Sequence, residues 1–364
     1  MSTQQFGDLL VQEALFDPLS WWGRVDGKRT AVIDSRTGAR YSYASLNVSA
    51  DAWAQYLHAH GARAGDRVAV MAQNRVEFIA LLFACIRLGA VLVPLNWRLA
   101  AAELSRVLAD AEPMLVLGEQ RWRDVTTEAL SMSMSIYMSM SASHADAAVS
   151  GAAESRWVDL DDASRRVEIT PTTKVDRFVV ERTTNDAVLL LYTSGSTGAP
   201  KGVIIPHRQL LANAIATTTA WALGADDVGP AATPFFHTGG WNVFTTPLLY
   251  RGGTVVMIES FDAARYFETL TEYGVTVTFG VPTQLAMLRE SPKWGTPLPK
   301  LRWFIAGGAP CPQRIKDDVR AAGYRIREGY GLTECGPNCF GTNDETSVPV
   351  SYTHLRAHET KANL

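Results

Sequence analysis

Hydrophobic and polar positions in the first 120 residues follow two alternating periods. Short, largely apolar runs at Arg67 to Met71, Val91 to Pro94 and Met114 to Leu117 are typical of buried parallel strands. Between them lie segments of helical length, the mostly apolar Val76 to Leu88 and the amphipathic Glu103 to Asp110. Because strand and helix alternate, the pattern predicts a parallel sheet with helices on its faces.

A hairpin and a helix are predicted upstream of this sheet. Thr30 to Ser35 and Arg40 to Tyr43 are strand-like runs separated by a short turn. The helix that follows would end near Gly61, which suits a left-handed cap. Its apolar face is formed by Leu46, Ala50, Trp53 and Leu57.

The second half of the chain repeats the alternation and predicts a second βα lobe. The segment Arg208 to Ala222 is predicted as a helix whose N-terminus lies near a glycine-rich loop, where the helix dipole would favour phosphate. Asp262 and Gly274 have the residue types that begin and end a helix. The predicted strands are Thr254 to Ile258, Val275 to Phe279, Arg302 to Ala306 and Tyr324 to Glu328, and the other helices are Asp262 to Tyr273, one from Pro282, and Pro312 to Ala322.

Residues 131–151 interrupt the pattern with alternating serine and methionine followed by an alanine-rich run. A segment this polar and repetitive is predicted to be a poorly ordered surface insertion. Methionine thioethers can bind Cu(I), which is the alternative interpretation of the repeat.

Composition excludes several classes of protein. An apolar content of 47% and a formal charge of −3 are ordinary for a globular protein, and no basic excess suggests nucleic acid. The longest apolar run, Phe78 to Ile86, is far shorter than the roughly 20 residues of a membrane span. Without a secretory pattern at the start, we expect a cytoplasmic protein.

Four cysteines without a CxxC pair suggest reduced thiols, although the spacing of Cys335 and Cys339 leaves a metal site as an alternative.

One segment carries most of the chemical information. An apolar strand, Leu189 to Tyr192, runs into a hydroxyl- and glycine-rich stretch, residues 193–202, that contains Lys201. Glycines let backbone N–H groups approach an anion, and the hydroxyls and the lysine add donors and charge. A Walker A loop needs glycine before the lysine and Ser or Thr after it, but Pro200 and Gly202 occupy these positions. We therefore predict a phosphate-binding loop of another kind.

The segment resembles the phosphate loop of the adenylate-forming (AMP-binding) superfamily, which includes acyl-CoA synthetases, amino-acid adenylation domains and luciferases. Two further motifs follow in the family's order, ending with Glu328 to Glu334. The resemblance implies an α/β fold, the family's large N-terminal domain, over residues 1–346. It also implies that the phosphates of ATP are bound by Thr193, Ser194, Gly195, Ser196, Thr197, Gly198 and Lys201.

The segment Phe235 to Trp241 resembles the part of the family fold that lines the acyl pocket. The resemblance implies that His237 borders the reacting carboxylate and that glycines leave room for the substrate. Amino-acid-activating members carry an aspartate here, whereas this chain has no acidic residue from Phe235 to Tyr250. Since a buried, unpaired ammonium is costly, we predict a fatty or other apolar acid as substrate, with an aryl acid as alternative. The predicted substrate residues are His237, Gly239, Trp241, Gly280 and Val281.

The last two motifs resemble the adenine and metal sites of the family. By this resemblance Tyr330 stacks on adenine, Thr333 contacts a phosphoryl group and Glu334 holds Mg²⁺, roles that suit an aromatic face and a carboxylate. Adenine would also meet Gly308, Ala309 and Pro310, with Glu328 beside it. The predicted catalytic residues are Lys201, His237, Thr333 and Glu334.

The implied reaction joins a carboxylate to ATP, giving an acyl-adenylate and pyrophosphate, after which CoA displaces AMP in the full-length enzyme. Members of the family continue into a small C-terminal domain that cannot be located here. Residues 347–364 do not resemble the family and are predicted to be a foreign or disordered tail, where His354 and His358 have metal-ligand spacing. We therefore expect a fragment with impaired turnover, and a catalytically silent nucleotide- or acyl-binding module remains the alternative.

Overall fold

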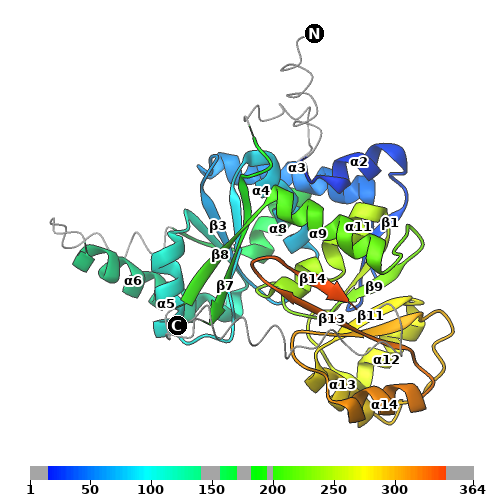
Figure 1. Ribbon diagram of the computed structural model, residues 1–364. Coiled ribbons are helices and arrows are strands. Elements are labelled where there is room, and N and C mark those ends of the chain that lie inside the picture. The colour runs from blue at the N-terminus through cyan, green and yellow to red at the C-terminus, as the bar shows by residue number, and fades with distance from the viewer. Residues whose placement is uncertain (1–14, 141–155, 170–181, 195–199, 342–364) are drawn as a thin grey trace.

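Three sheets organise the chain in the computed structural model (Figure 1), which describes residues 15–140, 156–169, 182–194 and 200–341. The largest sheet has six strands in the order β6-β5-β3-β4-β7-β8, and its pairs are parallel except for β7 with β8. Its strands are β3 (Arg67–Met71), β4 (Val91–Pro94), β5 (Leu115–Gly118), β6 (Trp157–Asp159), β7 (Ala187–Ser194) and β8 (Pro200–Pro206).

The second sheet joins two strands near the start of the described chain to two strands from its second half. The predicted hairpin, β1 (Thr30–Asp34) with β2 (Arg40–Ser42), is confirmed. However, β1 lies parallel to β10 (Thr254–Met257), which in turn pairs with β9 (Val228–Ala231). The hydroxyls of two residues reinforce the seam, because Thr254 donates to the Thr30 carbonyl at 2.9 Å and Ser35 donates to the Met257 carbonyl at 2.8 Å.

The third sheet has the order β11-β12-β13-β14 and forms the lower lobe in Figure 1. Its strands are β11 (Val277–Gly280), β12 (Trp303–Ala306), β13 (Ile326–Leu332) and β14 (Gly336–Gly341). Its helices are α12 (Ala263–Glu272), α13 (Pro282–Arg289) and α14 (Gln313–Ala321). The predicted cap is confirmed, since an Asp262 carboxylate oxygen accepts from the backbone N–H groups of Ala264 and Arg265.

The main core lies around α4 (Glu77–Leu88), which is apolar nearly all round and is buried on all its faces. Its one cation, the partly buried Arg87, forms ion pairs with Asp17 and Asp51 at 3.1 and 2.7 Å. Around it pack α2 (Pro18–Val25), α3 (Tyr43–Ala59), α9 (His207–Ala220) and α11 (Thr245–Arg251), whereas α5 (Ala101–Ala111) packs in a separate buried cluster with Ala69 and Met71 of β3. Shorter or peripheral elements are η1 (Gln120–Trp122), α6 (Arg123–Met140), α8 (Leu160–Ile169) and α10 (Thr238–Asn242).

The prediction of a poorly ordered insertion over residues 131–151 is wrong for its first part. Residues 131–140 continue helix α6, and the remainder lies outside the described residues. The serines satisfy their hydroxyls on the helix itself, because Ser131 donates to the Thr127 carbonyl and Ser133 to the Leu130 carbonyl. Met134 packs against the buried cluster that contains Leu130. The alternating serines therefore do not prevent Ser133 and Met134 from packing against the core.

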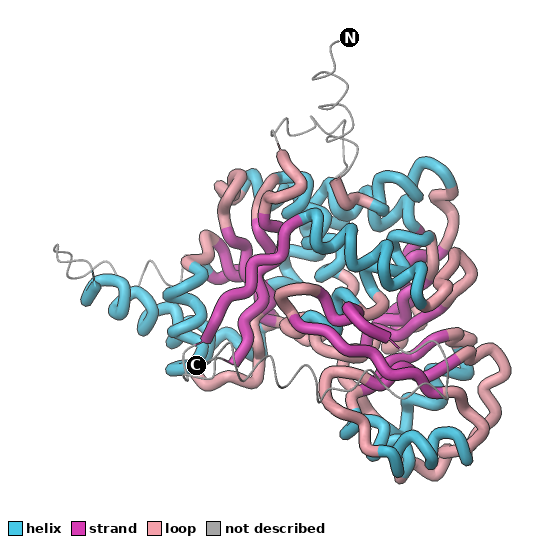
Figure 2. Tube along the Cα trace, in the orientation of Figure 1, coloured by secondary structure: helices cyan, strands magenta, loops and turns pink. Residues whose placement is uncertain are grey.

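The predicted position of α9 beside the phosphate loop is also wrong. A strand that the sequence analysis missed, β8, separates the loop from the helix, and β7 and β8 run side by side as a long hairpin (Figure 2). The first residue of α9, His207, donates its backbone N–H to the Asp186 carbonyl at the opposite end of that hairpin. Seven residues of strand span about 20 Å, so the dipole of α9 cannot act on phosphate at the loop.

The sequence predicted that no apolar run is long enough to span a membrane, and the described helices agree. Within the described ranges, no helix combines the length and the apolar character needed to cross a bilayer.

Candidate active site

The predicted phosphate loop lies at the turn of the β7–β8 hairpin. Thr193 pairs with Lys201 and Ser194 with Pro200, so these four residues form the last rungs before the turn. Lys201 is exposed and lies next to the turn of the hairpin. The loop residues Gly195, Ser196, Thr197 and Gly198 lie outside the described residues. The hairpin nevertheless holds both ends of the loop in register, which gives a phosphate loop a fixed base.

The β13–β14 hairpin carries the predicted adenine and metal residues. Tyr330 is in β13, and the pairing of Leu332 with Gly336 leaves Thr333, Glu334 and Cys335 in a tight turn. The side-chain amide of Gln209, on α9, donates to the Thr333 carbonyl at 2.9 Å and ties the turn to that helix. Glu334 is exposed. An exposed carboxylate fits Mg²⁺ that takes its remaining ligands from phosphate oxygens and water.

The turn at Gly308, Ala309 and Pro310, which is predicted to meet adenine, lies directly beside this hairpin. Strands β12 and β13 are parallel, with Ala306 opposite Glu328. A side chain at Gly307 would come within 2.9 Å of the Gly329 carbonyl, so the two backbones touch. Gly308 then adopts a φ of +78°, which favours glycine, and the exposed Gly308, Ala309 and Pro310 face solvent next to β13. The structure thus brings together two motifs whose paired residues, Ala306 and Glu328, are 22 positions apart in the sequence.

Glu328 is held by an ion pair that the sequence analysis missed. The Lys316 ammonium, on α14, lies 3.0 Å from its carboxylate, and the two side chains are only 10% and 12% exposed. A pair buried to this degree fixes the first half of β13 against α14. Any role of Glu328 toward adenine stays a prediction.

A cavity of about 520 Å³ lies where the predicted acyl site should be. His237 and Val281, both predicted substrate residues, lie in its lining. Gly280 lies buried just before Val281 at the end of β11. The cavity is bordered by segments that follow β4, β9, β10 and β11, and its lining includes Trp97, Arg98, His237, Phe261, Val281 and Gln284.

The structure places Trp241 behind this cavity, in the core. Its side chain is fully buried, its indole N–H donates to the Phe235 carbonyl at 2.6 Å, and the two rings lie 4.2 Å apart. The neighbouring glycines serve packing as well, because a side chain on Gly240 would lie 2.7 Å from the Pro234 carbonyl oxygen. Gly239 lies beside a small separate pocket. Direct contact of Trp241 and Gly239 with substrate stays a prediction.

The charge distribution in the cavity favours an anion. Burial lowers the pKa of His237, and the nearby Arg98 guanidinium lowers it further, so the imidazole is neutral at pH 7. Arg98 lies over the Trp97 ring at 4.7 Å and near the Phe236 ring at 5.7 Å. Among the described residues, no carboxylate forms an ion pair with Arg98. The cation next to His237 was missed in the sequence, where its only signal is an arginine after an aromatic residue at the end of a buried strand.

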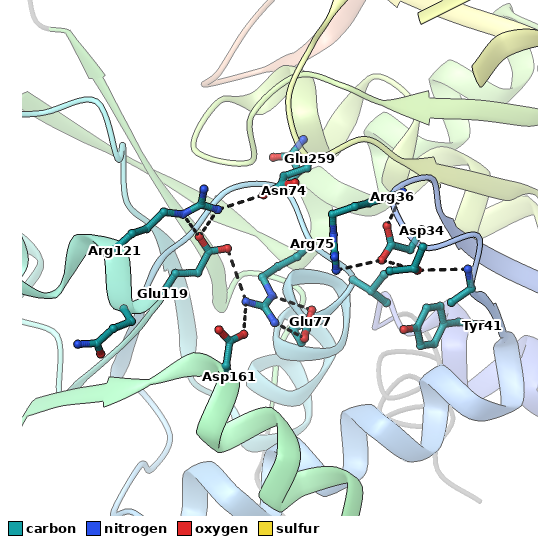
Figure 3. A pocket seen from close by; sticks show the side chains of 14 residues that line it. Asp34, Arg36, Tyr41, Asn74, Arg75, Glu77, Glu119, Arg121, Asp161 and Glu259 are labelled. Atoms are coloured by element: carbon teal, nitrogen blue, oxygen red, sulfur yellow. Dashed lines mark hydrogen bonds and ion pairs between the residues drawn. The ribbon is translucent and has the colours of Figure 1, made fainter. Parts of the chain in front are cut away.

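A second cavity, of about 650 Å³, adjoins the first and shares Asn74 and Glu259 with it (Figure 3). In this cavity the cations and carboxylates are paired with each other. Arg75, for example, forms ion pairs with Glu77 at 2.6 Å and with Asp161 at 2.8 Å. Burial raises the pKa of Glu119, although its partner Arg121 opposes the shift.

Arg121 also reaches Glu259 at 3.1 Å, which links the end of β5 to the end of β10. This ionic cluster joins two sheets. The arginines that line this second cavity are already paired with carboxylates. Of the two cavities, the one that contains Arg98 therefore suits the carboxylate of a substrate.

Comparisons with known proteins agree with this geometry. The chain is 32% identical over 301 residues to a feruloyl-CoA synthase of Amycolatopsis, covering 82% of this chain and 56% of the relative. It is 33% identical to an indoleacetate–CoA ligase of Aromatoleum aromaticum, covering 81% and 56%. A long-chain-fatty-acid–CoA ligase of Mycobacterium tuberculosis is 32% identical, with 86% and 59% covered. The chain therefore spans somewhat more than half the length of these curated relatives.

The fold comparison leads to the same group. The inhibitor-bound N-terminal domain of FACL13 from Mycobacterium tuberculosis superposes with a TM-score of 0.75 at 29% identity, covering 87% of this chain and 75% of that domain chain. ATP-bound MatB from Rhodopseudomonas palustris gives a TM-score of 0.74 at 27% identity, covering 91% and 63%. The family model described as AMP-binding enzyme matches residues 19–358. The chain belongs to the AMP-binding enzymes and has the fold of their N-terminal domain.

Proposed function

We propose that this chain is the nucleotide- and acid-binding part of an acid–CoA ligase that forms an acyl-adenylate. The observation that carries the proposal is the contact of β12 with β13, which sets the Gly308 turn beside Tyr330 and the Thr333–Glu334 turn. In the reaction, a carboxylate oxygen attacks the α-phosphorus of ATP and pyrophosphate leaves. CoA thiol would then displace AMP in the complete enzyme.

The residues divide this work by their position. Lys201, at the base of the hairpin loop, would neutralise charge on the phosphates together with the loop hydroxyls. Glu334 would hold Mg²⁺, which would offset negative charge on the phosphates, and Tyr330 would stack on adenine. The neutral imidazole of His237 can donate one N–H hydrogen bond to the carboxylate of the acid, without forming an ion pair with it.

The cavity supports an apolar acid as substrate. Its walls include Trp97, Phe261 and Val281, and its lining carboxylate, Glu259, is already paired with Arg121. A substrate ammonium would therefore find no free partner, which argues against an amino acid. Fatty acids fit this description. The aromatic wall, and the similarity to ligases for ferulate and indoleacetate, favour an aryl acid as the second candidate.

Arg98 is expected to hold the carboxylate of the incoming acid. A charge-assisted hydrogen bond contributes about 1.5–3 kcal/mol, so Arg98→Ala should weaken binding of a free aryl or fatty acid about tenfold or more. Arg98→Lys should keep part of the affinity because the charge remains. The measurement is a titration of acid into chain saturated with a non-hydrolysable ATP analogue. Equal affinity for the acid in both variants and the parent would show that Arg98 does not contact the bound carboxylate.

Nucleotide binding tests the proposed function itself. We expect a non-hydrolysable acyl-adenylate analogue to bind the folded chain, and Tyr330→Ala to weaken it about tenfold, since base stacking on an aromatic ring contributes about 1–3 kcal/mol. Isothermal titration calorimetry measures both, and Tyr330→Phe, which keeps the ring, is the matched control.

A folded chain that binds neither MgATP nor the analogue would contradict the proposal. Binding without ATP–pyrophosphate exchange, in a chain extended by the C-terminal domain of a relative, would instead identify a catalytically silent binding module.

A further inference from the structure

Two exposed cysteines meet across the β13–β14 turn. Cys335 ends the turn and Cys339 lies in β14, and their sulfur atoms are 2.9 Å apart. The other two cysteines, Cys85 and Cys311, are buried. Of the four thiols in the sequence, only this pair is both accessible and adjacent.

The backbone of the turn brings the two sulfurs together. The strand register shifts between Tyr330 and Leu332, and Gly336 has a φ of +94°, a conformation that favours glycine. As a result, both thiols approach the Gly336 carbonyl, which lies 2.9 Å from the Cys339 sulfur and 3.8 Å from the Cys335 sulfur. A disulfide needs a sulfur separation of about 2.05 Å, so a shift of less than about 1 Å would allow the bond.

The pair is poorly suited to a structural metal. Among the described residues, no group of three or more histidine, cysteine or acidic side chains is placed to hold an ion. A structural zinc site takes four protein ligands, and two thiols alone do not provide them. A disulfide, by contrast, needs no protein group beyond the two sulfurs, only an external oxidant.

We propose that Cys335 and Cys339 form a reversible redox modification site whose oxidant is a hydroperoxide. One sulfur attacks the peroxide, giving a sulfenic acid and releasing water or the corresponding alcohol. The second sulfur then displaces the sulfenic oxygen as water and closes a disulfide. Two electrons pass in total from the two thiols to the peroxide. A small dithiol returns both sulfurs to the reduced state by exchange.

The position of the pair links it to the proposed nucleotide site. Cys335 directly follows Glu334, and the turn is held to α9 from two sides. Gln209 binds the Thr333 carbonyl, and the Asn338 amide donates to the Thr217 hydroxyl at 2.9 Å. A disulfide would close a loop of the five residues from Cys335 to Cys339, which contains the anchor Asn338 and begins two residues after the anchor Thr333. We infer that oxidation reorients Glu334 and weakens binding of Mg²⁺-nucleotide, a step that rests on the proposed function.

The modification is tested chemically, without reference to activity. The folded chain is treated with hydrogen peroxide, quenched, alkylated with N-ethylmaleimide and mapped by mass spectrometry. We expect the loss of two alkylation sites, a peptide 2 Da lighter that links Cys335 to Cys339, and full recovery after dithiothreitol. The single variants Cys335→Ser and Cys339→Ser should form no such link. Continued alkylation of both cysteines after peroxide, or only intermolecular dimers, would overturn the proposal.

The regulatory step has a separate readout. Oxidised parent chain should bind the MgATP analogue at least fivefold more weakly than reduced chain, whereas Cys339→Ser should respond to peroxide by less than twofold. Equal affinity in a chain shown to carry the disulfide would overturn the link to Glu334. Failure of the proposed function looks different, because the chain would then bind no nucleotide in either redox state.

Discussion

Gly331→Ala is expected to abolish binding of the acyl-adenylate analogue, with a loss of at least a hundredfold. A Cβ atom at this position would lie 2.2 Å from the Gly336 carbonyl oxygen and 2.4 Å from the Pro337 Cα. Both atoms belong to the backbone of β14, so no side-chain rotation can relieve the overlap. The strands must separate, and the turn that carries Thr333 and Glu334 moves with them. Calorimetric titration measures the loss.

The matched control is Gly224→Ala. No atom lies within 4 Å of the position that its Cβ would occupy, and its φ is outside the left-handed region. We expect this variant to bind the analogue within a factor of two of the parent. Circular dichroism of both variants separates a local change in the hairpin from general unfolding. If Gly331→Ala binds like the parent, β13 and β14 cannot be in contact as described.

The elements that local sequence predicted correctly are those that depend on neighbouring residues. The β1–β2 hairpin, the Asp262 cap and the strands β3 and β4 are encoded by periodicity, turn residues and capping within about 15 positions. The pairing of β1 with β10 could not be predicted in this way. It joins Val32 to Val255, and two apolar strands show no preference for each other that the sequence reveals without an alignment.

For the candidate site, the motifs predicted which residue types matter but not how they are supported. The position of Tyr330 and Glu334 in one hairpin depends on β14, whose sequence, Gly-Pro-Asn-Cys-Phe-Gly, contains the glycine and proline typical of turns. Arg98 has no motif of its own, because its role depends on meeting His237 from 139 positions away. Contacts of this kind are set by tertiary packing, which overrides local propensity.

His207 should make the stability of the fold depend on pH. Its side chain is 2% exposed, and Nδ1 has no hydrogen-bond partner among the described residues. Burial and, to a smaller extent, the Arg182 cation lower the pKa of His207 to about 4, while Asp186 and Asp17 oppose the shift. Its position as the first residue of α9 adds the positive end of the helix dipole. The folded state therefore resists protonation.

The unfolded chain, with a histidine pKa of about 6.5, takes up this proton as the pH falls, so stability is lost between about pH 6.5 and pH 4. At pH 5 the loss from His207 is about 2 kcal/mol. We expect His207→Phe, which cannot titrate, to lose that much less unfolding free energy than the parent between pH 7.5 and pH 5, as measured by urea denaturation. Arg182→Gln removes one cause of the shift and should give an intermediate loss. An identical pH dependence in the parent and His207→Phe would mean that the buried imidazole is already protonated in the native protein, and that its surroundings supply a partner for the charge.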